Sequence, residues 1–199
     1  MNNDLVFTPI RQLAELLKSR QISPMQLSEI FLDRLEQRGP SYNALTTLTR
    51  ERASRQAEQA EREISAGDYK GPLHGIPWGA KDLLATSDGI PTSWGAAPLK
   101  DQTFDFDATV VRRLEEAGAV LAGKLAMIEL AGGMGYRQPT ATFTGPPRNP
   151  WNRETWTGGS SAGSGAAVAA GLVPFAIGSE TWGSILSPAN NCGIAGLRP

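Results

Sequence analysis

Serine hydroxyls and a lysine amine are the side chains of this sequence whose types and spacing suit chemistry. The serines gather in residues 157–199, which read TGGSSAGSGAAVAAGLVPFAIGSETWGSILSPANNCGIAGLRP. Serine is a weak nucleophile and needs a base to take its proton. A lysine can be that base when burial lowers its pKa, since desolvation disfavours the ammonium form. The glycine-rich backbone can supply N–H groups that stabilise an oxyanion. These residues suggest acyl transfer by a serine and a lysine, and the alternative is a structural Gly/Ser-rich loop.

Lys81 is the lysine that the sequence places in an apolar setting. The short apolar run 76–80 is interrupted by Pro and Gly and predicts a strand that ends beside it. The competing interpretation is a surface lysine whose aliphatic stem lies along apolar neighbours. The local sequence leaves both interpretations open.

Composition excludes several other chemistries. The chain has 199 residues, a formal net charge of -1, one histidine (His74) and one cysteine (Cys192). One residue of each type does not make a His/Cys metal site, and the near-neutral charge gives no support to a nucleic-acid or membrane partner. No apolar run of about 20 residues and no signal peptide is visible, and a lone cysteine fits a cytoplasmic location. We expect His74 to be a hydrogen-bonded structural residue and Cys192 a small buried side chain.

Two familiar motifs match only in part. Residues 118–125 (GAVLAGKL) resemble a phosphate-binding P-loop, but Leu125 stands where a Ser or Thr must hold magnesium. Residues 159–163 (GSSAG) match the nucleophile elbow of α/β-hydrolases, which needs a strand before it and a histidine after it. We predict no good strand over 152–159, and no histidine follows. Both motifs are therefore rejected.

The elements that must position the serines and the lysine alternate between helices and strands. Thr8-Pro9 and Ser23-Pro24 each predict a helix start, and Gly39-Pro40 is expected to end the second helix. Further helices are expected over 50–66 (capped by Gly67), 107–117 and 166–170, and strands over 44–49, 76–80, 119–122 and 174–177, the last of them buried. Residues 86–106 and 131–156 are rich in Gly and Pro and predict loops. The alternation favours an α/β sheet with crossover helices.

Some side chains are expected to have structural roles only. The charges of the helix 50–66 are expected on a solvated face, and Lys124 is given no catalytic role. Four tryptophans are expected as core or pocket-wall residues: Trp78, Trp94, Trp156 and Trp182.

The serine-rich stretch closely resembles the amidase signature family. Residues 158–185 carry the likeness, and LHGIPWGAKD (73–82), GAVLAGKLAMIEL (118–130) and PRNPWN (147–152) support it in order and spacing. The resemblance implies an α/β fold with a mixed, twisted central β-sheet flanked by helices. It also implies that residues 1–199 are the N-terminal part of a single domain, with a helical region at about 8–70 and a catalytic α/β core at about 71–199.

The family's Ser–cis-Ser–Lys triad implies a role for three residues of this sequence. Ser184 would be the nucleophile, Ser160 the bridging serine after a cis Gly159–Ser160 bond, and Lys81 the base. The resemblance also implies an oxyanion hole of backbone N–H groups, from Thr181, Trp182, Gly183 and Ser184. Ser161 and Asp82 would support the triad, and neither cofactor nor metal is implied.

The function that the resemblance implies is hydrolysis of carboxylic amides through a serine acyl-enzyme. One alternative is the A subunit of a glutamyl-tRNA amidotransferase, which is weakened by Leu186 where many members carry Arg. The other is an inactive fragment, because family members are more than twice this long and the chain would expose strand edges and apolar surface. Trp182 departs from the usual glycine and is expected to narrow the pocket. The expected partner is a small-molecule amide, with neither nucleic acid nor membrane, and a homodimer is possible.

Overall fold

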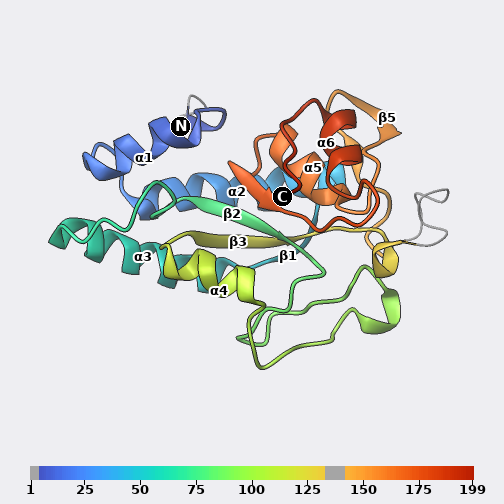
Figure 1. Cartoon of the computed structure of the whole chain (residues 1–199), viewed down its shortest axis with the longest axis horizontal. Coiled ribbons are helices and arrows are strands. Elements are labelled where there is room, and N and C mark those ends of the chain that lie inside the picture. The colour runs from blue at the N-terminus through green and yellow to red at the C-terminus, as the bar shows by residue number, and fades with distance from the viewer. Residues whose placement is uncertain (1–4, 133–141) are drawn as a thin grey trace.

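The computed structural model describes residues 5–132 and 142–199. A mixed four-stranded sheet forms its centre (Figure 1). Its strands are β1 (Leu45–Leu48), β2 (Pro77–Lys81), β3 (Val120–Leu125) and β6 (Phe175–Ile177). The strand order is β1-β3-β2-β6, with β2 parallel to β3 and β6, and β1 antiparallel to β3. The predicted α/β architecture with a mixed central sheet is confirmed.

Helices cover both faces of this sheet. They are α1 (Ile10–Lys18), α2 (Pro24–Tyr42), α3 (Arg50–Ala66), α4 (Thr109–Glu116), α5 (Ala162–Ala169) and α6 (Leu186–Cys192). Short 3-10 turns occupy Ala97–Leu99 and Glu129–Ala131. In the view of Figure 1, α2 and α5 lie above the sheet and α3 and α4 below it. Among the described residues, no helix has both the length and the apolar character to cross a bilayer.

The helix α2 begins where the sequence predicts and ends later. Ser23 and Gln26 form a reciprocal capping box, with the Gln26 N–H 3.2 Å from Ser23 Oγ. The prediction that Gly39-Pro40 ends the helix is wrong, because α2 continues to Tyr42. Proline lacks one N–H, so it removes a single bond from the last turn. The helix ends at Asn43, which takes the left-handed conformation with φ 49°.

The helix α5 starts four residues earlier than predicted, at Ala162 instead of Ala166. Gly163, in the first turn of this helix, packs closely against the backbone that follows β3. Its N–H donates to Ala126 O at 2.7 Å, and a Cβ at this position would lie 2.5 Å from Ala126 N. Tertiary contact therefore overrides the low helix propensity of glycine.

Two segments around the sheet differ from what the sequence predicts. A hairpin of β4 (Arg148–Asn149) and β5 (Asn152–Trp156) occupies part of the region expected as a loop without a good strand. It lies outside the central sheet, and β5 ends three residues before Gly159–Ser160, so it is not the strand of a nucleophile elbow. The strand β6 is half-buried instead of buried, because it pairs only with β2 among the described residues and forms an edge. Residues 133–141 of the predicted loop lie outside the described residues.

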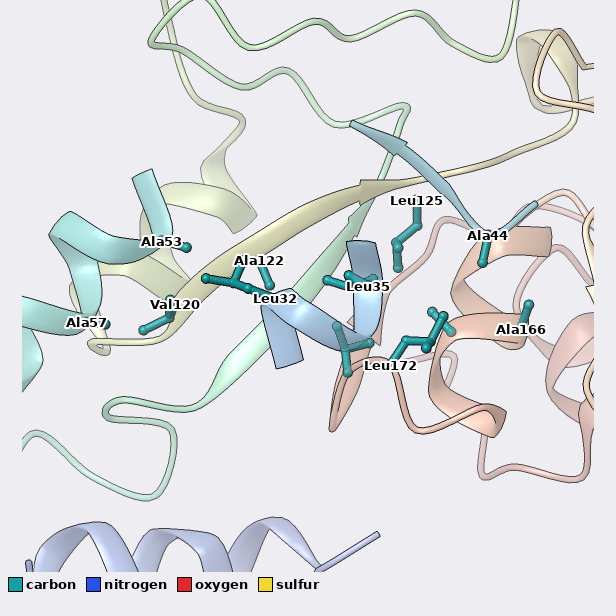
Figure 2. Packing of buried hydrophobic residues seen from close by; sticks show 12 residues of the cluster. Leu32, Leu35, Ala44, Ala53, Ala57, Val120, Ala122, Leu125, Ala166 and Leu172 are labelled. Carbon is teal, nitrogen blue, oxygen red and sulfur yellow. The ribbon is translucent and has the colours of Figure 1, made fainter. Parts of the chain in front are cut away.

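The largest cluster of buried apolar side chains joins the helices to the sheet. Figure 2 shows Leu32 and Leu35 of α2 beside Ala122 of β3 and near α5. Each fully buried leucine contributes about 1.5–3 kcal/mol to the free energy of folding. Ala53 and Ala57 of α3 are buried in the same cluster, as the narrow alanine face of this helix predicts.

The expectation of a fully solvated charged face on α3 is wrong for Arg52. This side chain is 4% exposed, and its Nη2 lies 2.6 Å from Asp107 Oδ2 and 2.7 Å from Glu115 Oε2. Burial opposes the charge, but the two carboxylates raise the pKa of Arg52 above its ordinary value. Asp107 lies before α4, which begins at Thr109 and not at the predicted Asp107. Arg52 therefore ties α3 to α4 and to the loop before it.

Candidate active site

Three segments that are far apart in the sequence meet at one edge of the sheet. Lys81 is the last residue of β2, and the loop 178–185 follows the parallel strand β6. Ser160 and Ser161 precede α5, whose first turn packs beside both strands. The carboxyl ends of parallel strands lie at the same edge, which is where α/β proteins hold ligands. The topology thus brings Lys81 and the serines together.

Lys81 is buried and contacts two serines. Its side chain is 0% exposed, and its Nζ lies 2.7 Å from Ser160 Oγ and 2.8 Å from Ser179 Oγ. The interpretation of Lys81 as an ordinary surface lysine is therefore wrong. Burial lowers the pKa of Lys81 from 10.5 to about 7. At neutral pH a large share of this amine is uncharged and able to accept a proton.

Ser160 is held by its backbone as well as by Lys81. The Gly159–Ser160 peptide bond is cis, as the family resemblance implies. Ser160 O accepts the N–H of Ile128 at 3.1 Å. Gly159 lies against the same isoleucine, since a Cβ here would overlap Ile128 Cδ1. These contacts leave the Ser160 hydroxyl facing the lysine.

Ser184 lies in the loop that approaches these residues. It is 4% exposed, and its carbonyl oxygen accepts the N–H of Ser161 at 3.0 Å. The backbone of Ser184 is therefore in direct contact with the residue after Ser160. The predicted nucleophile, bridging serine and base come from three different elements and are brought together in one site.

Ser161 links the two ends of the loop. Its hydroxyl donates to Ser179 O at 3.3 Å and accepts the N–H of Ser179 at 3.3 Å, while its own N–H donates to Ser184 O. These bonds are consistent with the role that the resemblance implies for Ser161, which is to hold the residues of the triad in place.

Glu180 crosses the loop that carries Ser184. Its Oε2 accepts the N–H groups of Ile185 at 2.8 Å and Leu186 at 2.9 Å. The N–H of Leu186, followed by those of Ile185 and Gly183, keeps the pKa of Glu180 below its ordinary value. The carboxylate thereby fixes the backbone of the segment that contains the predicted oxyanion donors, Thr181, Trp182, Gly183 and Ser184, and it engages the Gly183 N–H itself in this structure.

The four tryptophans do not share one environment. Trp78 is buried, as predicted, and Trp94 and Trp156 are half-buried. Trp182 is 93% exposed, so the prediction of a core or pocket-wall residue is wrong for it. It lies at the tip of the 181–183 bend, where no described residue covers it. Among the described residues it therefore narrows no pocket.

Asp82 belongs to a second polar cluster beside the site. Its Oδ1 lies 3.4 Å from Lys124 Nζ, and both side chains are 0% exposed. Asp82 also accepts the N–H of Ser93 at 3.1 Å and the Ser93 hydroxyl, while Lys124 donates to Thr92 Oγ1 at 2.5 Å. Burial lowers the pKa of Lys124 to about 8 and raises that of Asp82. The cluster anchors residues 91–95 against the end of the sheet.

His74 and Cys192 have the structural environments that were expected. His74 Nδ1 accepts the N–H of Lys70 at 3.1 Å, and its Nε2 lies 2.9 Å from Glu63 Oε2. Burial lowers the pKa of His74. Cys192 is buried, which raises the pKa of its thiol to about 11 and leaves it protonated at neutral pH.

Ser179 is the residue of this site that sequence reasoning missed. It lies two residues beyond β6, so its place after a parallel strand was the available signal. The family motif covers Ser179 as well, but the family's triad assigns roles only to Ser160 and Ser184 among these serines. Which serine of the loop faces the amine depends on the turn that the backbone makes after Ile177.

The site and fold together define a class of protein. A buried amine of lowered pKa faces a serine hydroxyl at the carboxyl edge of a mixed sheet, an arrangement suited to acyl transfer by serine and lysine. A family model described as Amidase matches residues 26–199. The chain belongs to the amidase family.

Known relatives cover nearly the whole chain. The A subunit of glutamyl-tRNA(Gln) amidotransferase from Azoarcus sp. (strain BH72) is 44% identical over 98% of this chain and 39% of its own length. Putative amidase AmiD of Mycobacterium bovis is 42% identical over 96% of this chain and 39% of its own length. The native peptide amidase of Stenotrophomonas maltophilia has a TM-score of 0.80 at 34% identity, over 92% of this chain and 38% of its own. The chain thus spans about two fifths of the length of these relatives.

Proposed function

We propose that this protein hydrolyses carboxylic amides through a serine acyl-enzyme, with Ser184, Ser160 and Lys81 as its triad. One observation carries the proposal: the fully buried Lys81 amine lies 2.7 Å from Ser160 Oγ. The lowered pKa of Lys81 supports its role as base. The backbone contact between Ser184 and Ser161 supports the place of the nucleophile.

The proton of Ser184 passes along a short relay. The Ser184 hydroxyl donates to Ser160, whose own proton moves to the neutral amine of Lys81. Ser184 Oγ then attacks the amide carbonyl, and the backbone N–H groups of 181–184 stabilise the oxyanion. The proton returns through Ser160 to the leaving amine as the C–N bond breaks. Water then attacks the acyl-enzyme along the same relay and releases the acid.

The substrate and setting follow as part of this proposal. We infer a small-molecule amide, because two of the relatives are named as amidases. The reaction needs no cofactor or metal, since the amine and hydroxyls supply all proton transfers. The lone buried cysteine supports a cytoplasmic location. Neither nucleic acid nor membrane is proposed as a partner, and a homodimer is a further proposal that light scattering tests.

A second candidate function is that of a glutamyl-tRNA amidotransferase A subunit, which is the name of the relative from Azoarcus sp.. It predicts glutaminase activity that rises with a partner protein and tRNA. Leu186 argues against it, because this apolar side chain replaces the arginine of many members. Turnover of simple amides without turnover of glutamine would rule it out.

The test of the main proposal is the Ser184→Ala variant of the full-length protein. We expect loss of amide hydrolysis and of labelling by a fluorophosphonate, which should map to Ser184 in the unsubstituted protein. Ser164→Ala is the matched control, because Ser164 is also buried but, in the part of the chain that the structure describes, its hydroxyl donates only to Ile177 O. Hydrolysis that survives in Ser184→Ala, or an adduct on a different serine, would contradict the assignment.

The alternative of an inactive chain has its own test. A thermal melt of the 199-residue chain shows whether it folds cooperatively, and an amide assay on the same sample shows whether it turns over. A cooperative transition together with amide hydrolysis would exclude this alternative.

A further inference from the structure

The amine of Lys81 has a second serine partner that the triad does not use. Lys81 Nζ lies 2.8 Å from Ser179 Oγ and 3.4 Å from Ser179 O, in addition to its contact with Ser160. Within residues 5–132 and 142–199, three oxygens therefore surround the nitrogen, and two of them belong to Ser179. Burial alone lowers the pKa of a lysine, so the two oxygens of Ser179 are not needed for that purpose.

The hydrogen-bonding capacity of the amine determines what each oxygen can do. A neutral primary amine has two N–H bonds and one lone pair. A carbonyl oxygen only accepts, so Ser179 O must face an N–H. If Ser179 Oγ accepts the other N–H, the lone pair is left for the remaining oxygen, Ser160 Oγ. In the proposed relay, Ser160 Oγ is the atom that donates its proton to the lone pair of Lys81.

We propose that Ser179 is a positioning residue, whose hydroxyl and carbonyl oxygens bind both N–H bonds of the neutral Lys81 amine and turn its lone pair toward Ser160. The inference rests on the proposed function. It assigns to Ser179 no contact with the substrate. Its effect is on the orientation of the base.

The same three oxygens suit the protonated form. An ammonium group has three N–H bonds, and each finds one of the three oxygens without movement of the nitrogen. In the proposed relay the Ser160 proton moves to the amine and the Ser184 proton takes its place on Ser160, so the Ser160 oxygen then accepts the new N–H. Preorganised partners of this kind keep the cost of reorganisation during proton transfer low.

Ser179 is itself held in place by the residue after Ser160. The Ser161 hydroxyl contacts both the N–H and the carbonyl oxygen of Ser179, each at 3.3 Å. Gly178 allows this approach, since a Cβ there would lie 2.7 Å from Ser161 Oγ. Ser161 therefore fixes the backbone whose oxygen atoms face Lys81.

The charged groups around the amine are engaged elsewhere. Asp82 and Lys124 pair with each other at 3.4 Å, and the Glu180 carboxylate accepts backbone N–H groups of its own loop. Burial is the cause that lowers the pKa of Lys81, and no charged neighbour among the described residues adds to it. A change at Ser179 should therefore act on Lys81 directly.

The kinetic test compares Ser179→Ala with Ser164→Ala in the full-length protein. We expect Ser179→Ala to lower kcat about 10- to 100-fold with KM nearly unchanged, because substrate binding is retained while the base is misdirected. The acid limb of kcat/KM should move to lower pH, because the ammonium form loses an acceptor. Ser164→Ala should keep both values. Ser179→Thr, which retains a hydroxyl, should recover most of kcat.

A second measurement does not depend on catalysis. In protein labelled with [ε-13C]lysine, the Lys81 resonance is assigned from its loss in Lys81→Met and titrated against pH. We expect its midpoint to fall by about 0.5 to 1 pH unit in Ser179→Ala and to stay unchanged in Ser164→Ala. An unchanged midpoint, or a kcat within about twofold of the unsubstituted protein, would overturn the role of Ser179. Hydrolysis that survives in Ser184→Ala would instead overturn the proposed function, and the titration would still decide the contact of Ser179 with Lys81.

Discussion

Lys81 shows how one buried amine sets the pH response of the whole site. Its pKa of about 7 has one cause, removal from water, because no described carboxylate pairs with it. Burial disfavours the charged ammonium form, and for the same reason the amine is partly neutral and can act as a base at neutral pH. Both the activity and the free energy of unfolding should therefore change with pH as Lys81 titrates.

The first prediction concerns activity. The value of kcat/KM should rise with pH through about 7, as Lys81 loses its proton, and then reach a plateau. Lys81→Met should abolish hydrolysis, because the proton of Ser160 then has no acceptor. Measurement of kcat/KM between about pH 5 and about pH 9 on a neutral amide checks this. A profile that is flat across about pH 7 would contradict the assignment of Lys81 as the base.

The second prediction concerns stability. Between about pH 7 and pH 10.5, Lys81 is protonated in the unfolded chain and mostly neutral in the folded chain. Stability should therefore rise with pH across this window, and the full cost of the buried amine is present below it. Urea unfolding at several pH values should show a smaller rise in Lys81→Met than in the unsubstituted protein. An identical rise in both would show that Lys81 is not deprotonated on folding.

The helix α5 illustrates how an element is positioned by the absence of side chains. Gly163 lets the first turn of α5 approach the end of β3, where Ala126 O accepts its N–H at 2.7 Å. Gly165 similarly approaches Pro188 of α6, since a Cβ there would lie 2.9 Å from Pro188 Cβ. Both glycines thus determine where Ser160 and Ser161 lie relative to the sheet.

The third prediction tests this close approach. A Cβ on Gly163 would lie 2.5 Å from both Ala126 N and Ala44 O, which are backbone atoms that cannot move aside. Alanine gains about 1 kcal/mol of helix propensity over glycine. The clash should exceed this gain, so Gly163→Ala should destabilise the protein by about 1–3 kcal/mol in urea unfolding and lower activity.

Gly132→Ala is its control, since a Cβ there meets nothing within 4 Å among the described residues. We expect its stability to stay within about 0.5 kcal/mol of the unsubstituted protein. Equal stability in both variants would show that the approach of α5 does not need glycine.

At the scale of the whole molecule, two buried cations hold the segment between β2 and α4 in place. Arg52 binds Asp107 at one end of this segment, and the pair Lys124–Asp82 binds residues 91–93 in its middle. This segment forms the large excursion below the sheet in Figure 1. Removal of one partner of a buried ion pair leaves an uncompensated charge in the interior, which is strongly destabilising.

The fourth prediction tests the Lys124–Asp82 pair. Lys124→Met should destabilise the protein by about 3–5 kcal/mol, because it leaves the Asp82 carboxylate buried without a cation. Adding Asp82→Asn should recover part of this loss, since an amide oxygen can still accept the bonds from Ser93. Urea unfolding of the single and double variants measures the recovery. A double variant less stable than Lys124→Met alone would contradict this account.

The sequence alone predicted most of the elements and most of the candidate site residues, but neither the hairpin of β4 and β5 nor Ser179. Apolar periodicity and capping residues gave α3 its bounds, Arg50–Ala66, because these signals are local. The motif around Ser160 and Ser184 pointed to the residues for chemistry, because a family resemblance preserves type and spacing. The cis bond before Ser160 was anticipated in the same way.

Only the tertiary structure decided which groups touch. The start of α5 at Ala162, the burial of Arg52 and the exposure of Trp182 all depend on neighbours that are distant in the sequence. The contact between Lys81 and Ser179 depends on the parallel pairing of β2 with β6, which brings residues 98 positions apart within 2.8 Å. Local patterns specify which conformation a segment favours, whereas the partner of a buried amine is set by how those segments pack.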